Sequence, residues 1–258
     1  VGIVATLLLL SAKSSIAWQG DTLRHYGDIA GNLLRAGLRD GEAYAMLSSL
    51  TSSAGHRLSG SPGAAVAVEL TRKMMEERGF NNVRLEPVIV PHWVRGPVEE
   101  AVILKSPHQK ALPLSVCALG GSIATPKSGI TAEVVEVHSF DELQQLGDSA
   151  RGKIIFFNRP MDPTKLNTFE AYGGAVDQRG SGAVMAAKAG GVAALVRSMT
   201  LVVDDFPHTG AMDYEEGVNE VPAAAVSRLG ALRLSQRLKS DKHLKLRLKL
   251  TCRTLPDV

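Results

Sequence analysis

The chain has 258 residues, of which 45% are hydrophobic, 21% charged and 5% aromatic, and its formal net charge is +3. This length is enough for one or two globular domains with a proper core, and the composition is ordinary for a globular protein. The low aromatic content and the weak net charge argue against a nucleic-acid-binding surface, which needs clustered cations and stacking rings.

The first ten residues form an apolar stretch, and Ser15 and Ala17 occupy the small-residue positions of a signal-peptidase site. This pattern predicts a secretory signal peptide over residues 1–17, with its basic leader missing. The apolar run is shorter than the roughly 20 residues that a spanning helix requires. The alternative is an uncleaved anchor, and no other segment is predicted to cross a bilayer.

Residues 26–50 carry an imperfect helical apolar stripe that Gly37 and Gly41 interrupt. A second helix is predicted to begin at Pro62, because Ser61 suits the N-cap and proline fits the first helical position. Gly79 is its expected stop. This helix is expected to bury Val66, Leu70 and Met74 on one face, and residues 82–90 are expected to form a strand.

The middle of the chain predicts a strand–helix–strand unit. Residues 152–158 (GKIIFFN) and 192–196 are apolar runs bounded by turn residues, and the Ala-rich segment 183–189 lies between them. A polar loop with a histidine, Pro207-His208-Thr209-Gly210, follows the second strand. Ser139 is predicted to cap a short helix over residues 139–146.

Three further elements are predicted near the end of the chain. Residues 221–226 read as a buried strand, and residues 228–238 as a helix with Leu229, Leu232 and Leu234 inward. Residues 243–252 (HLKLRLKLTC) alternate strictly, which places leucines on one face of a strand and basic residues on the other. We interpret the basic face as solvated rather than as a nucleic-acid patch, since no aromatic residues interleave the charges.

The two cysteines, Cys117 and Cys252, permit one internal pairing. A secretory context allows a disulfide. Both residues lie within strand-like patterns, however, so buried free thiols are the favoured interpretation.

Several long segments in collinear order resemble one family of enzymes. They are EPVIVPHWVRG (residues 86–96), GGSIATPKSGITAEVVEV (120–137), SFDELQQL (139–146), GKIIFFN (152–158) and PHTGAMDYEEGV (207–218). They resemble zinc-dependent exopeptidases that carry an inserted protease-associated domain. The resemblance implies an α/β fold, namely the amino-terminal part of a zinc-exopeptidase α/β/α sandwich with a β-rich insert.

The same resemblance implies a division of the chain. Residues 18–94 would hold a propeptide-like segment and the opening helices and strand of the peptidase domain. Residues 95–239 would form the protease-associated insert, and residues 240–258 would be a strand that returns to the peptidase domain.

The family's metal motif is missing from this stretch. Its members hold two zinc ions, and their first ligand motif is His-x-Asp, whereas none of the seven histidines here has Asp two residues later. The resemblance implies that all zinc ligands and catalytic residues lie past Val258. The stretch should therefore contain no metal or catalytic residue and should be inactive alone.

Two loops are candidate substrate contacts. His56, Arg57 and Ser59 resemble the loop before the family's first long helix, where Arg57 would bind a carboxylate at the cleft rim; the alternative is a turn that only starts a helix. His208 could reach toward a substrate, or it could be a loop histidine held by backbone hydrogen bonds.

The resemblance finally implies a secreted or lysosomal metallopeptidase, a carboxypeptidase or dipeptidase. It would hydrolyse dipeptides or terminal residues of peptides and would form a homodimer. The alternative function is a non-catalytic, secreted protease-associated module that binds or sorts protein partners.

Overall fold

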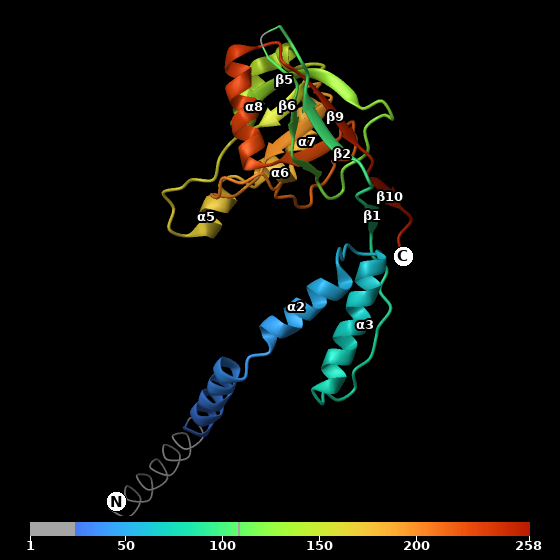
Figure 1. Cartoon of the computed structure of the whole chain (residues 1–258), viewed down its shortest axis with the longest axis vertical. Helices are drawn as coiled ribbons and strands as arrows, with labels where there is room; N and C mark the ends of the chain where they lie inside the picture. The colour runs from blue at the N-terminus through green and yellow to red at the C-terminus, as the bar shows by residue number, and fades with distance from the viewer. Residues whose placement is uncertain (1–23, 108) are drawn as a thin grey trace, which may run out of the picture. The chain divides into compact units, whose positions relative to one another are not determined.

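The computed structural model describes residues 24–107 and 109–258, which form two compact units (Figure 1). The helical unit takes in the described residues up to Arg57, together with Gly63–Leu85. The sheet unit takes in Leu58–Pro62 and Glu86–Val258. The predicted signal peptide, residues 1–17, lies outside the described residues. Within the described ranges no helix combines the length and apolarity that a bilayer crossing requires.

The helical unit follows the predicted pattern of helices and breaks. Residues 24–39 are helical, the chain leaves the helix at residues 40–42, and α2 (Ala43–Ala54) follows. The break contains Gly41, one of the two predicted interruptions, whereas Gly37, the other, lies inside the first helix. The next helix, α3 (Pro62–Glu77), begins at the predicted proline, and Gly79 beyond its end has a φ of 74°, which a residue with a side chain rarely adopts.

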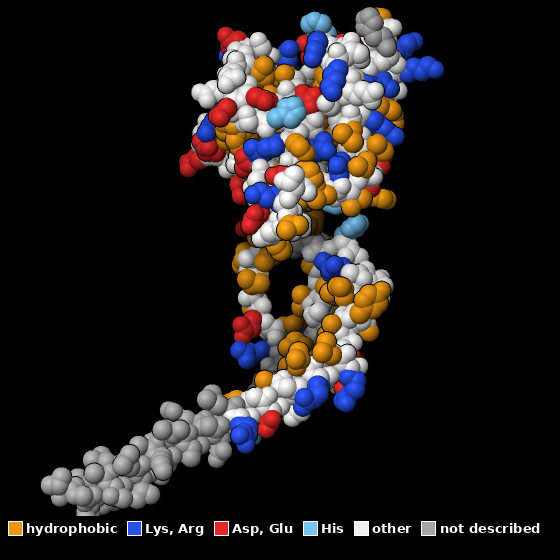
Figure 2. Space-filling model, turned by 90° about the vertical axis from the view of Figure 1, so that its left-hand side faces the viewer, with side chains coloured by type: hydrophobic (Ala, Val, Ile, Leu, Met, Phe, Trp, Pro, Cys, Tyr) orange, Lys and Arg blue, Asp and Glu red, His pale blue; other side chains and the backbone are white. Residues whose placement is uncertain are grey.

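The prediction that α3 buries a full apolar face is wrong. Of its residues only Met74 is buried, while Val66 is exposed and Leu70 is half-buried. An apolar stripe is buried only where another layer packs on it, and this unit offers helices alone. Figure 2 accordingly shows hydrophobic side chains on the surface of these helices.

The predicted strand over residues 82–90 is also absent. The first strand, β1 (His92–Val94), starts later and pairs antiparallel with β10 (Arg253–Leu255). A strand needs a partner for its backbone groups. At the end of the predicted segment Val90 exchanges two backbone hydrogen bonds with Val258, which continues the β1–β10 pairing without a strand of its own.

The sheet unit is built on one mixed sheet of eight strands in the order β3-β2-β9-β5-β6-β7-β8-β4. The strands are β2 (Glu99–Ile103), β3 (Leu112–Leu114), β4 (Val116–Ala118), β5 (Ile130–Val137), β6 (Ile154–Phe157), β7 (Ala193–Arg197), β8 (Ala223–Val226) and β9 (Lys245–Leu250). The accompanying helices are α4 (Phe140–Leu146), η1 (Gly147–Ala150), α5 (Thr168–Gly173), α6 (Asp177–Gly180), α7 (Gly182–Lys188) and α8 (Arg228–Ser240). The fold is thus mixed α/β, as predicted.

The two ends of this sheet are joined. β3 and β4 lie at opposite ends of the strand order, yet only Ser115 separates them in the chain. Ser115 accepts a backbone hydrogen bond from Ser227, just past β8. The segment 112–118 therefore closes the sheet on itself, which protects strand edges that would otherwise invite pairing with another chain.

Strands β5 to β8 form a parallel core with helices on both faces. β6, α7 and β7 are the predicted strand–helix–strand unit, and β6 pairs parallel with β7. One buried cluster joins α8 to one face of the sheet, and a second joins α4 and α7 to the other. The cap of α4 is also as predicted, because Ser139 Oγ accepts from the Glu142 backbone N–H over 3.0 Å.

The alternating segment near the end of the chain forms β9, as predicted. One face of the strand is fully buried: no leucine on it is more than 1% exposed, from Leu244 just before the strand through Leu246, Leu248 and Leu250. On the other face Arg247 is exposed to solvent. β9 lies between β2 and β5. The sheet therefore extends beyond residue 239, which is the predicted end of the insert.

The inward face of α8 differs from the prediction at one position. Ala231, Leu234 and Leu238 are buried and Leu229 is half-buried, whereas Leu232 is exposed. The buried residues follow the i, i+3, i+7 spacing of one helix face. Leu232 lies off that face and is exposed, so its apolar side chain did not indicate burial.

We expect Leu248→Ala to lower the free energy of unfolding of the sheet unit by about 3 kcal/mol, because it leaves a cavity in the sheet core. The matched control is Arg247→Ala, a change on the solvent face of the same strand, which should cost less than about 0.5 kcal/mol. Urea unfolding followed by circular dichroism measures both. Equal effects of the two substitutions would show that β9 is not packed as described.

Candidate functional site

The first candidate loop makes one local and one long-range hydrogen bond. His56 and Arg57 are exposed residues of the helical unit, and Arg57 Nη1 donates to the Gly55 carbonyl over 2.6 Å. Ser59 belongs to the sheet unit, where its Oγ donates to the Pro91 carbonyl, 32 residues further along the chain, over 2.7 Å. Both bonds hold the loop's backbone in place, and the role of the loop at a cleft rim stays a prediction.

His208 lies in the loop between β7 and β8. Its backbone N–H donates to Ser198 Oγ over 2.8 Å, and its ring Nε2 is 3.9 Å from Asp204 Oδ2. The side chain is partly exposed. The backbone hydrogen bond holds the loop in place, while the imidazole remains available to solvent and to a ligand.

A buried polar network at the carboxyl ends of β5, β6 and β7 was not predicted. Arg197, only 6% exposed, donates from Nη1 to Asn158 Oδ1 over 2.9 Å, and Asn158 Nδ2 donates to Glu136 Oε1. Ser235 of α8 donates to the same Glu136 oxygen over 2.8 Å. Burial, followed by the nearby Arg228 charge, lowers the pKa of the Arg197 guanidinium, and Glu136 partly offsets this effect.

This network ties three strands to α8 across the sheet. A buried charge is tolerated when it is hydrogen-bonded and near an opposite charge; Asn158 supplies the hydrogen bond to Arg197, and Glu136, bonded to Asn158, supplies the opposite charge. The sequence carries a weak signal for it, because a polar residue ends each of the apolar runs of β6 and β7. Nothing local indicated that these polar residues would meet on one face of the sheet.

Cys117 is a candidate nucleophile that stands beside a charge pair. Its Sγ is 2.9 Å from Arg95 Nη1, which also lies 3.2 Å from Glu99 Oε1. Burial raises the pKa of the Cys117 thiol, against the opposing effect of Arg95. A thiol that stays protonated at neutral pH is a poor nucleophile, so the arrangement does not support cysteine chemistry. Cys117 and Cys252 are both free, as predicted.

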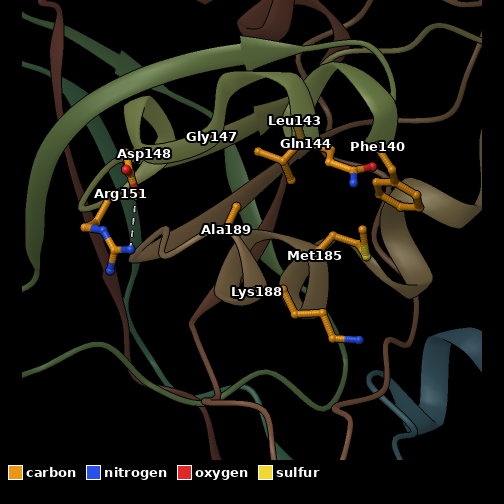
Figure 3. A pocket seen from close by; sticks show the side chains of 9 residues that line it. All are labelled: Phe140, Leu143, Gln144, Gly147, Asp148, Arg151, Met185, Lys188 and Ala189. Atoms are coloured by element: carbon orange, nitrogen blue, oxygen red, sulfur yellow. Dashed lines mark hydrogen bonds and ion pairs between the residues drawn. The ribbon is translucent and has the colours of Figure 1, made fainter.

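A surface groove of about 450 Å³ lies between α4–η1 and α7 (Figure 3). It is lined by Phe140, Leu143, Gln144, Gly147, Asp148, Arg151, Met185, Lys188 and Ala189. Arg151 and Asp148 pair over 3.3 Å at one end of the groove, and Phe140 and Met185 lie at the other. Lys188 pairs with Glu215 over 2.7 Å.

The lining of this groove suits binding rather than catalysis. Its apolar side chains could hold an apolar group, while the two cations at its margin are already paired with Asp148 and Glu215. Its lining includes no Ser, Cys, Thr or His, so it offers no nucleophile–base pair of the usual kind. We therefore describe it as a binding groove.

The described residues do not bring a set of zinc ligands together. Residues 24–107 and 109–258 contain no group of three or more His, Cys, Asp or Glu side chains placed to hold a metal ion. A structural or catalytic zinc site needs at least three such protein ligands. The described residues therefore do not fit the zinc that the resemblance implies.

Comparison with known proteins gives a consistent group of relatives. No family model matches the chain. The chain is 36% identical to carboxypeptidase Q from Bos taurus over 270 aligned positions, which cover 100% of this chain and 54% of that protein. It is 37% identical to carboxypeptidase Q from Homo sapiens, covering 90% of this chain and 47% of that protein. The chain thus spans about half the length of the curated relatives it matches.

A solved structure shows the same fold. The peptidase M28 precursor from Shewanella amazonensis SB2B superposes with a TM-score of 0.82 at 36% identity. The match covers 90% of this chain and 51% of that one. The α/β fold is therefore that of a peptidase M28 protein over the matched part.

We expect Cys117 to alkylate slowly at pH 7.5, because burial raises the pKa of its thiol and so lowers the thiolate fraction. Iodoacetamide labelling read by peptide mass spectrometry should give a rate several-fold lower in the folded chain than in urea. The Cys252→Ser variant isolates Cys117. A folded-state rate equal to the unfolded one would mean that the thiol is neither buried nor protonated.

Proposed function

The chain is a relative of carboxypeptidase Q, and we propose that it is the part of a secreted or lysosomal zinc-dependent exopeptidase that lacks the metal site. The observation that carries the proposal is the similarity to carboxypeptidase Q over 100% of this chain. The parent would act as a carboxypeptidase or dipeptidase, on dipeptides or terminal residues of peptides. It would work as a homodimer.

In this proposal the described residues supply no catalytic group. The parent's two zinc ions would polarise the scissile carbonyl and activate water. No described cluster fits them, so their ligands would lie in the remaining half of the parent. The stretch would accordingly be inactive alone.

We assign residues 95–239 to a protease-associated insert that shapes access to the substrate cleft. The compactness of the sheet unit supports this assignment, and β9 would extend the sheet of the insert past residue 239. His208, partly exposed in its anchored loop, would contact substrate from the insert. His56, Arg57 and Ser59 would line the rim.

A non-catalytic binding module would explain the binding groove but not the length of the match. The similarity to the bovine relative includes the helical unit as well as the sheet unit, since it covers the whole chain. A module that consisted of the insert alone would not retain that helical part. The peptidase is therefore the function we propose.

We expect the purified chain to release no amino acid from a panel of dipeptides, with or without added zinc. The measurement is amine release, with bovine carboxypeptidase Q as the positive control. Turnover that a chelator abolishes and zinc restores would refute the missing metal site. A gene in which His-x-Asp and further ligands follow residue 258 would support the peptidase parent.

We also expect limited proteolysis to leave a resistant core from about Arg95 through β9, because the sheet is closed and its strands are buried. The extended residues 83–91, outside any described strand, should be cut first. Fragment masses report the cut sites. Early cleavage within β5 to β8 would contradict a compact insert.

A further inference from the structure

Two arginines, which we call the arginine pair, lie together at the carboxyl ends of the parallel strands. Arg197 is the last residue of β7, and Arg228 is the first residue of α8, which follows β8. The two strands are neighbours, with Arg197 opposite Val226, and Ser198 donates its backbone N–H to the Val226 carbonyl over 2.9 Å. Burial and, after it, the charge of Arg228 lower the pKa of Arg197, as a like charge close by does.

Neither guanidinium of the arginine pair uses all of its N–H donors. Arg197 is 6% exposed, and its one side-chain hydrogen bond within the described residues runs from Nη1 to Asn158 Oδ1 over 2.9 Å. Arg228 is half-buried and donates from Nη1 to the Leu201 carbonyl. Its Nε is buried and has no hydrogen-bond partner in residues 24–107 and 109–258. Buried donors without a partner are rare in proteins and often indicate a bound water or ion.

The acidic side chains near the arginine pair are bound to other groups. Their partners are Arg233 for Asp205 over 3.7 Å, His208 for Asp204 over 3.9 Å, and Asn158, Ser235 and His138 for Glu136. Glu136 partly offsets the lowered pKa of Arg197, but it reaches that guanidinium only through Asn158. Two guanidinium charges therefore share one carboxylate, and one positive charge is left over.

We propose that Arg197 and Arg228 bind the carboxylate group of a small organic anion. A carboxylate accepts two parallel hydrogen bonds from a guanidinium, and its single charge matches the positive charge left over. A sulfate or phosphate dianion would bring more negative charge than this partly buried place can neutralise. The carboxyl ends of parallel strands are also where α/β proteins bind their ligands.

The ligand would enter beside Arg228, since Arg197 lies deeper. Leu201, whose carbonyl accepts from Arg228, has an exposed side chain, as does the next residue, Val202. These two side chains would contact an apolar group attached to the carboxylate. The site therefore suits a branched aliphatic acid such as isovalerate. The inference concerns the sheet unit alone and does not rest on the proposed function.

The test is thermal unfolding of the 258-residue chain, followed by calorimetry, as isovalerate is added in place of chloride at constant ionic strength. We expect the midpoint of the sheet unit to rise by at least about 3 °C when the isovalerate concentration is about ten times its dissociation constant. Isovaleramide, which has nearly the same shape but no charge, should not raise the midpoint. An equal rise with isovaleramide would overturn the proposal, as would a rise with sulfate and none with isovalerate.

Two variants locate the effect. Arg228→Gln should abolish the rise, whereas the matched control Arg247→Gln should keep it, because Arg247 is an exposed arginine on the solvent face of β9. Equal rises in the two variants would overturn the proposal. If Arg228→Gln fails to fold, the guanidinium N–H signals of the unchanged chain are followed by NMR during the titration. Signals of Arg197 and Arg228 that stay in place as isovalerate is added would likewise overturn it.

Discussion

The sheet unit depends on the burial of the β9 leucines against α8 and the sheet core. β9 comes near the end of the chain, yet it pairs with β2 on one side and β5 on the other. Without it, the antiparallel pair β2–β3 would have no link to the parallel strands except through β4. Because Ser115 joins β3 to β4, the leucine strand completes a closed sheet with no long free edge.

That closure decides where ligands and partners can bind. Both faces of the parallel strands are covered by helices, so the accessible features lie at the strand ends and between helices. The carboxyl ends hold the Glu136–Asn158–Arg197 network and, beyond it, the loop with His208. The groove beside α7 lies on the helix layer instead. None of these places combines the donors that a metal-dependent hydrolase needs.

The accuracy of the sequence predictions varied with how local the responsible interaction is. Ser139, Pro62 and Gly79 act within one turn of a helix, and the structure has the ends they predicted. Val66 and Leu232 were expected to be buried because they are apolar, but burial needs a second layer at that position. The strand expected over residues 82–90 is absent for a similar reason. The partner strand β10 pairs with residues from His92 onward, where Leu255 lies opposite His92.

The sequence by itself determined the strand–helix–strand unit, the two faces of β9 and the kinship with exopeptidases, because each is written in residues close together in the chain. Only the tertiary structure decided which strands are neighbours, that the sheet closes through Ser115, and that Arg197 meets Glu136 through Asn158. These features join residues that are distant in the sequence. They follow from how the layers pack, and no local pattern specifies that.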